Sequence, residues 1–222
     1  MSADYSLYLD SKPENEDYTI PLFSVPLFHY KVENWEEKKV ELLKLYEERQ
    51  KSNEIKCSSG ANALDVETDY HSNSDNSFNY SDAITDIFED ELVDFANQTN
   101  LEISVNSTWF ERASKYKHHT CHNHGPAGYS AVCFIQFDPK HHTPTVFMNP
   151  ITAAENPCSL MPPGIREGSL ILFPSYLLHY TNSNESDIDR IILSFNLETE
   201  EECPDKFSDK TYDEGEYYTT DY

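Results

Sequence analysis

Four histidines and a cysteine lie within the eight residues HHTCHNHG, positions 118–125, of a chain that has nine histidines in all. Two of these histidines, His122 and His124, are two residues apart and directly precede the turn-forming sequence GPAG. Side chains at i and i+2 of an extended segment point to the same face, so both imidazoles can approach one ion from one side. The spacing predicts two ligands of a metal site.

A metal site needs further ligands, and His179 is the next candidate. It lies one residue before the end of the run GSLILFPSYLLHY, far enough along the chain for several strands to return it to the same place. Arg190 follows and opens the strand-forming run RIILSFNL. A guanidinium that points inward must meet an acid, and its planar fork binds an external carboxylate through two parallel hydrogen bonds. Together these residues predict a metal ion beside a dicarboxylate.

The elements that must position these residues begin with two predicted helices, over residues 34–50 and 81–98. In the first, Asn34 and Glu37 have the spacing of a capping box. Its predicted buried face carries Val40, Leu43 and Tyr46. The second helix keeps an apolar period of 3.6 residues, as amphipathic helices do.

From residue 101 onward the sequence consists of short runs of strand-forming residues separated by Pro, Gly, Asn and Asp. The runs are 102–110, 128–137, 144–148, 168–173 and 190–197. The earlier, proline-punctuated run IPLFSVPLFHY predicts an edge strand over residues 20–30. Two helices followed by short strands predict an antiparallel sandwich or jelly roll with the helices packed on one side.

Three segments, HNHGPAGYSAVCFIQF, GSLILFPSYLLHY and RIILSFNL, resemble the iron(II)/2-oxoglutarate-dependent oxygenase superfamily. The resemblance is to a poorly characterised branch with HxH and FPSxLxH segments, and IPLFSVPLFHY followed by a helix is similar to its N-terminal opening. It covers residues 20–30 and 105–197. It implies an α+β, mainly β fold: a double-stranded β-helix, a cupin-like jelly roll, with N-terminal helices packed on one side.

The resemblance also implies site roles. In the superfamily a His-x-Asp/Glu pair and a distal histidine hold iron(II), and an arginine or lysine binds the distal carboxylate of 2-oxoglutarate. His122 and His179 match the two histidines, and Arg190 matches the anchor. At His124 the sequence departs from the pattern, which has a carboxylate there. We expect His124 to complete a three-histidine face; the alternatives are a two-histidine site, or a remote acid as third ligand, for which Asp138 lies too far along the next strand.

Tyr116, Tyr129 and Ser130 are candidates for the co-substrate pocket, as is Trp109, although each of them also suits an ordinary core position. Because only alternate residues of the extended segment before GPAG can face inward, Cys121 should point away from His122. A structural zinc site that uses Cys121 is a weaker alternative.

The remaining histidines are predicted to have no direct role in holding the metal. His118 and His119 are expected at the surface or supporting the ligands, with His119 at most on the pocket rim. His141 and His142 fall at a turn in DPKHHTP and are expected to be solvated.

The formal charge of -24 on 222 residues excludes nucleic acids and anionic membrane surfaces as natural partners. Five cysteines without a CxxC pair indicate neither a disulfide framework nor a zinc knuckle, and favour a cytoplasmic location. No signal peptide or membrane anchor is evident at the N-terminus. We expect a polar extension (1–19), an oxygenase-like domain (20–197) and an acidic tail (198–222).

The function expected from this resemblance is an iron(II)/2-oxoglutarate-dependent dioxygenase that hydroxylates a C–H bond of a small molecule or peptide and releases succinate and CO2. One alternative is a three-histidine metal dioxygenase that does not use 2-oxoglutarate. Another is a non-catalytic, cupin-like binding module. Arg190 argues against both, because neither requires an anchor for a second acid.

Overall fold

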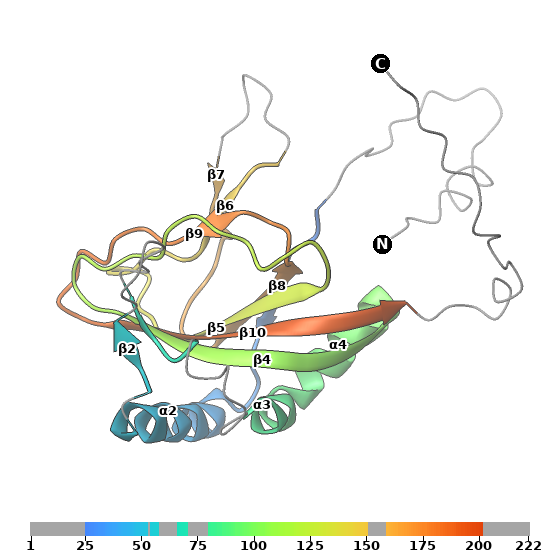
Figure 1. Ribbon diagram of the computed structural model, residues 1–222, viewed down its shortest axis with the longest axis horizontal. Coiled ribbons are helices and arrows are strands. Elements are labelled where there is room, and N and C mark those ends of the chain that lie inside the picture. Colours follow the sequence, from blue (N-terminus) through green and yellow to red (C-terminus); the bar gives the residue numbers. More distant parts are fainter. Residues whose placement is uncertain (1–24, 53, 58–65, 71–79, 151–158, 202–222) are drawn as a thin grey trace, which may run out of the picture.

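Two antiparallel sheets form the body of the protein (Figure 1). The computed structural model describes residues 25–52, 54–57, 66–70, 80–150 and 159–201, so the expected extension 1–19 and most of the expected tail lie outside the described residues. The large sheet has seven strands in the order β1 (Phe28–Lys31), β8 (Ser169–Pro174), β5 (Tyr129–Gln136), β10 (Arg190–Glu201), β4 (Leu101–Ala113), β3 (Glu67–Thr68) and β2 (Lys56–Cys57). The small sheet has the order β7 (Ser159–Leu160), β6 (Val146–Met148) and β9 (His179–Tyr180).

The predicted jelly-roll class is confirmed, with every strand pair antiparallel. β1 is the expected edge strand, paired only with β8 in the large sheet. β10 runs on to Glu201, so the first residues of the segment expected to be an acidic tail are paired with β4 instead.

Three helices, α2 (Trp35–Lys51), α3 (Ser81–Ile87) and α4 (Glu89–Thr99), cover one face of the large sheet (Figure 1). Their apolar residues form one core with the outer-facing residues of the sheet, in which Phe88 and Phe95 meet Phe195 and Phe110. The prediction of helices packed on one side is therefore confirmed. No helix within the described parts of the chain has the length and apolar character needed to cross a bilayer.

Three details of the helix predictions are wrong. Asn34 has a φ of 51° and makes no side-chain cap bond, because in this left-handed conformation its own carbonyl accepts the N–H groups of Glu37 and Lys38 instead. Val40 is 68% exposed, since the buried stripe of α2 runs through Leu42 and Tyr46. The helix predicted over 81–98 is interrupted at Phe88, which caps α3 and precedes α4.

The other face of the large sheet packs against the small sheet. Val132, Phe134 and Ile192 from the large sheet meet Phe147 of β6 in a second apolar cluster. Along β10 the alternation of a strand sends Leu193, Phe195 and Leu197 into the helix-side core. Arg190, Ile192, Ser194 and Asn196 therefore share the face between the two sheets. The candidate site is built on this face.

Candidate metal centre

His122, His124 and His179 converge on one point between the sheets. One ring nitrogen of each lies within 4.8 Å of those of the other two, and Nε2 of His122 is 3.2 Å from Nε2 of His124. Two nitrogens bound at right angles to one ion, each about 2.1 Å from it, are about 3 Å apart. The cluster has the spacing of three ligands on one face of a metal ion.

The backbone brings these distant residues together. His122 and His179 form a bridge in which the N–H of each donates to the carbonyl of the other at 2.9 Å, and the N–H of His124 donates to the carbonyl of Ser175. Gly128 then turns the chain into β5 with a φ of 78°, and a Cβ there would lie 2.4 Å from the carbonyl oxygen of Leu197. The glycine therefore allows the close approach that places the histidine segment over β10.

Hydrogen bonds to Nδ1 fix the tautomer of each histidine. The Nδ1–H of His122 donates to the carbonyl of Thr120 at 2.7 Å, and that of His179 donates to the carbonyl of Leu177 at 2.8 Å. His124 donates to Oδ1 of Asn196 at 2.8 Å. Because these oxygens accept the Nδ1 protons, each Nε2 keeps its lone pair for a metal, as outer hydrogen bonds do in protein metal sites.

Burial keeps the three imidazoles neutral. It lowers the pKa of His122 to about 4 and that of His179 to about 2, and the neighbouring imidazoles add to the effect. The pKa of His124 is also lowered, chiefly by burial. Since only neutral imidazole coordinates a metal, the set is ready to bind at neutral pH without losing protons.

We therefore expect the affinity for Ni(II), used as an inert probe, to stay nearly constant from pH 8 down to about 6.5, where an ordinary histidine is already half-protonated. The affinity should fall only as the pH approaches the lowered pKa of His122, about 4. Calorimetric titration without 2-oxoglutarate measures this. A steep loss of binding between pH 7.5 and 6.5 would contradict it. The metal-free protein should become less stable as the pH falls from about 6.5, the pKa of an ordinary histidine, toward the lowered pKa of His122. In this range the unfolded chain binds protons that the buried histidines of the folded chain do not bind.

A buried polar chain starts beside the cluster and leads away along the sheet. The ring of His119 stacks on that of His122 with centroids 3.9 Å apart, and its Nδ1 hydrogen bonds to Oε2 of Glu111 at 2.6 Å. Oε1 of Glu111 lies 3.9 Å from Nη2 of Arg190. The chain thus links a metal-facing histidine to the guanidinium that was expected to anchor an acid.

Arg190 is buried and only partly satisfied. Its Nη1 donates to the carbonyl of Thr143 at 3.2 Å, whereas neither Nη2 nor Oε1 of Glu111 has a hydrogen-bond partner among the described residues. Burial lowers the pKa of Arg190, and Glu111 opposes this effect. For Glu111, burial raises the pKa, but the charges of His119 and Arg190 outweigh it and bring the pKa below its usual range. An unsatisfied buried polar group calls for an explanation, and a bound ion, water or ligand is one of those available.

The other expected pocket residues divide between the two faces. Ser130 is buried on the metal-facing side, where its hydroxyl donates to Oδ1 of Asn196 and meets the hydroxyl of Ser175. The ring of Trp109 lies 5.2 Å from that of His124. Tyr129 instead packs in the helix-side core against Phe95, because it occupies the opposite parity of β5.

Tyr116 is 69% exposed in the turn after β4, with a positive φ of 66°, and does not approach the histidines. His142, expected to be solvated, is buried instead. Its Nδ1 accepts the N–H of Asp138 and its Nε2 donates to the carbonyl of Ile188, which ties two loops together. Cys121 is exposed, as expected from its parity, and its thiol contacts the sulfur of Met148 at 3.3 Å.

Sequence reasoning missed Glu111 and Asn196 and underrated His119. The position of Asn196 could have been predicted from the sequence. The alternation that points Arg190 inward also points Asn196 inward, six residues along the same strand. Glu111 carried a weaker signal: it is an acid that follows directly on the apolar pair Trp109 and Phe110 in the buried second half of β4.

Residues 107–196 match the sequence profile of a family described as "Putative 2OG-Fe(II) oxygenase". Among curated proteins, no relative is detected by sequence. Solved structures of similar fold include the alpha-ketoglutarate-dependent carbocyclase SnoK from nogalamycin biosynthesis, at 10% identity over 77% of this chain and 79% of that one, with a TM-score of 0.59. A Pseudomonas putida prolyl-4-hydroxylase shares 12% identity over 78% and 92%, with a TM-score of 0.53. The epimerase SnoN, in complex with Fe3+, alpha ketoglutarate and nogalamycin RO, shares 12% over 78% of each chain, with a TM-score of 0.54.

At these identities the solved structures establish the fold, a double-stranded β-helix, and the match over residues 107–196 makes this part of the chain similar to the 2OG-Fe(II) oxygenases. The matched segment contains all three clustered histidines and Arg190. The cofactors of that family are iron(II) and, as co-substrate, 2-oxoglutarate, and three neutral nitrogen ligands on one face suit such an ion.

Proposed function

We propose that this protein is a 2-oxoglutarate-dependent oxygenase that hydroxylates a C–H bond. One oxygen atom of O2 enters the substrate as a hydroxyl group and the other enters succinate, while the first carbon of 2-oxoglutarate leaves as CO2. The observation that carries the proposal is the placing of three convergent Nε2 atoms and a buried, incompletely bonded guanidinium on one face of the same sheet. When bound, iron(II) supplies the activation of O2.

In this proposal His122, His124 and His179 are the metal ligands. His124 is held by Asn196, whose Oδ1 also accepts the Ser130 hydroxyl and whose Nδ2 donates to Ser107 at 3.0 Å. Phe147 and Phe173 contact the ring of His179, with ring centroids 5.9 and 4.9 Å away, and exclude water from that side. Such shielding protects a reactive centre from side reactions.

Arg190 is the proposed anchor for the distal carboxylate of 2-oxoglutarate. Its guanidinium has five N–H groups, of which one is used by Thr143, so a fork remains even with Glu111 nearby. Glu111 repels an incoming carboxylate, and the balance of the two charges sets how tightly the co-substrate binds.

His124 is the proposed third ligand, since the described residues bring no carboxylate into the cluster. We expect His124→Asp to retain Fe(II) with a lower preference for Ni(II) and Cu(II), because a carboxylate replaces a nitrogen ligand and those ions favour nitrogen. His124→Ala should weaken binding about tenfold or more. Competition titrations with Fe(II), Ni(II) and Cu(II) measure the order of their affinities. If His124→Ala binds like the unmodified protein while His119→Ala loses metal, the third ligand is His119.

The test of the function is anaerobic addition of Fe(II) and then 2-oxoglutarate, watching for the weak visible charge-transfer band of the chelated 2-oxo acid. Admission of O2 should then release succinate and CO2 in equal amounts. A protein that binds metal but neither forms the band nor consumes 2-oxoglutarate would be a three-histidine dioxygenase or a binding module. The neutral three-imidazole set and the acid beside Arg190 are the observations that keep the former as a second candidate.

The substrate is proposed to be a small molecule or a peptide side chain, and the location to be cytoplasmic. Cys121 and Cys133 are both free thiols, which suits a reducing compartment and a ferrous cofactor.

A further inference from the structure

A cavity of about 280 Å³ borders His124 on the side of Asn196. Its wall comes from the end of β10, the turn before β5, and single residues of β4 and of the segment after β8. The lining includes Asn196 and Ser175, which both hydrogen bond to His124. A molecule in this cavity therefore touches the ring of a proposed metal ligand.

Among the described lining residues, the outer part of the cavity carries only negative charge. Glu198 and Glu200 line it, and none of its lining residues is a lysine or an arginine. Oε1 of Glu198 accepts the side-chain amide of Asn106 at 2.8 Å, which holds this carboxylate at the wall. The remaining polar lining groups are neutral, so a bound molecule meets a field of one sign.

The sheet register adds a third carboxylate on the same face. Glu200 stands directly opposite Glu102 on β4, and Glu198 is two residues away on the same side of β10. Like charges that face each other across a strand pair destabilise the sheet. All three side chains are exposed, and this part of β10 pairs with β4 alone, because pairing with β5 ends at Leu197. A positive group placed among them would relieve the repulsion.

The strip is not built to hold a metal ion. Within the described residues, the three clustered histidines are the group whose ligand atoms come close enough for one. Alternate residues of a strand are about 6.6 Å apart, which suits an extended organic molecule better than a single ion.

We propose that the cavity and the carboxylates of Glu102, Glu198 and Glu200, together the acidic strip, bind a protonated amine or guanidinium of the substrate. The inference rests on the proposed function, because it makes this cavity the approach to the metal. Since a strand rises about 3.3 Å per residue, Glu198 and Glu200 lie about 7 and 13 Å beyond Asn196. The positive group of the substrate is therefore separated from the carbon that is oxidised by a spacer of several bonds.

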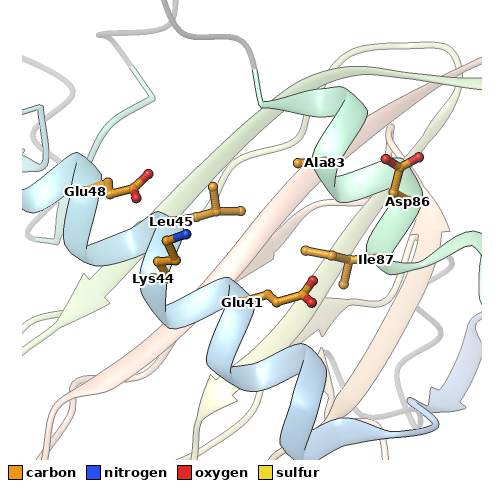
Figure 2. Close-up of a pocket in the computed structure, with 7 residues that line it drawn as sticks. All are labelled: Glu41, Lys44, Leu45, Glu48, Ala83, Asp86 and Ile87. Atoms are coloured by element: carbon orange, nitrogen blue, oxygen red, sulfur yellow. The ribbon is translucent and has the colours of Figure 1, made fainter.

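The pocket between α2 and α3 provides a matched control (Figure 2). It is lined by Glu41, Glu48 and Asp86 with Lys44 among them, and it lies on the helix side of the large sheet, away from the histidines. Removing two charges here changes the net charge of the protein as much as removing two from the acidic strip, but leaves the cavity beside His124 intact.

The experiment uses the metal-free full-length chain at about 0.15 M salt, where charges more than about 8 Å apart are largely screened. The probes are 1,6-diaminohexane and its neutral counterpart 1,6-hexanediol. Binding is followed by backbone amide shifts in two-dimensional NMR spectra. We expect the diamine to shift Gly128 and Thr199, and the diol to leave them unchanged. Glu198→Gln/Glu200→Gln should weaken diamine binding about fivefold to tenfold, whereas Glu41→Gln/Glu48→Gln should change it less than twofold.

Equal weakening by both double variants, or equal binding of the diol, overturns the proposal, since either result means non-specific attraction. Because the titration involves neither metal nor turnover, it is separate from the test of function. If the diamine binds at these residues but no 2-oxoglutarate is consumed, the binding site is supported and the oxygenase function is contradicted. If 2-oxoglutarate is consumed but the diamine causes no shifts near His124, the oxygenase function is supported and the cationic substrate is contradicted.

Discussion

Replacing His179 with alanine is expected to abolish stoichiometric metal binding, from one ion per chain to less than about a tenth. The substitution removes one of three nitrogen ligands. The two that remain, His122 and His124, are too few to hold an ion tightly. Losing even an outer supporting group costs about tenfold to a hundredfold in affinity, so losing a ligand costs more. Metal content after dialysis against Fe(II) or Ni(II) measures the effect.

Two controls separate ligand loss from misfolding. His179 is 4% exposed and packs against Phe147 and Phe173, so its truncation leaves a cavity that destabilises the fold. His122→Ala removes a less buried ligand and should lose metal with a smaller change in melting temperature. His141→Ala, at an exposed turn, should keep both metal and stability. Unchanged metal content in both His122→Ala and His179→Ala would overturn the metal site.

Replacing Arg190 with alanine is expected to leave metal binding intact and to raise the 2-oxoglutarate concentration needed for succinate formation at least tenfold. Truncating one partner of a buried charge pair typically costs about 2 to 5 kcal/mol. Arg190→Lys should recover part of the affinity, because an ammonium keeps the charge but lacks the fork. The concentration dependence of succinate release, measured at fixed Fe(II), gives the comparison.

Arg190→Ala also leaves Glu111 without its opposite charge, and an uncompensated buried carboxylate is strongly destabilising. The double variant Arg190→Ala/Glu111→Gln removes that charge and should fold more stably while still requiring high 2-oxoglutarate. Arg112→Ala, which removes an arginine paired with Glu67 and Asp189, should not change the requirement. Normal 2-oxoglutarate use by Arg190→Ala would mean that the acid is anchored elsewhere.

The local sequence was sufficient to predict the class of fold and to identify the candidate residues of the metal site. His122 and His124 were predicted on one face because i and i+2 spacing in an extended segment leaves no other arrangement. The family resemblance joined them to His179 and Arg190. The strand runs and amphipathic helices predicted a jelly roll with helices on one side, because burial of alternate residues depends on local periodicity alone.

Which groups support those residues depends on how the whole chain folds. Tyr129 and Ser130 are neighbours in sequence, and the parity of β5 sends one into the helix-side core and the other to Asn196. Both assignments were equally compatible with the sequence, because a buried strand is apolar on both faces.

The contacts of His119, Glu111 and Arg190 join residues from three separate segments, and the acidic strip depends on the register that sets Glu200 opposite Glu102. Local sequence does not specify which strands pair or in what register, because both depend on the packing of the whole chain.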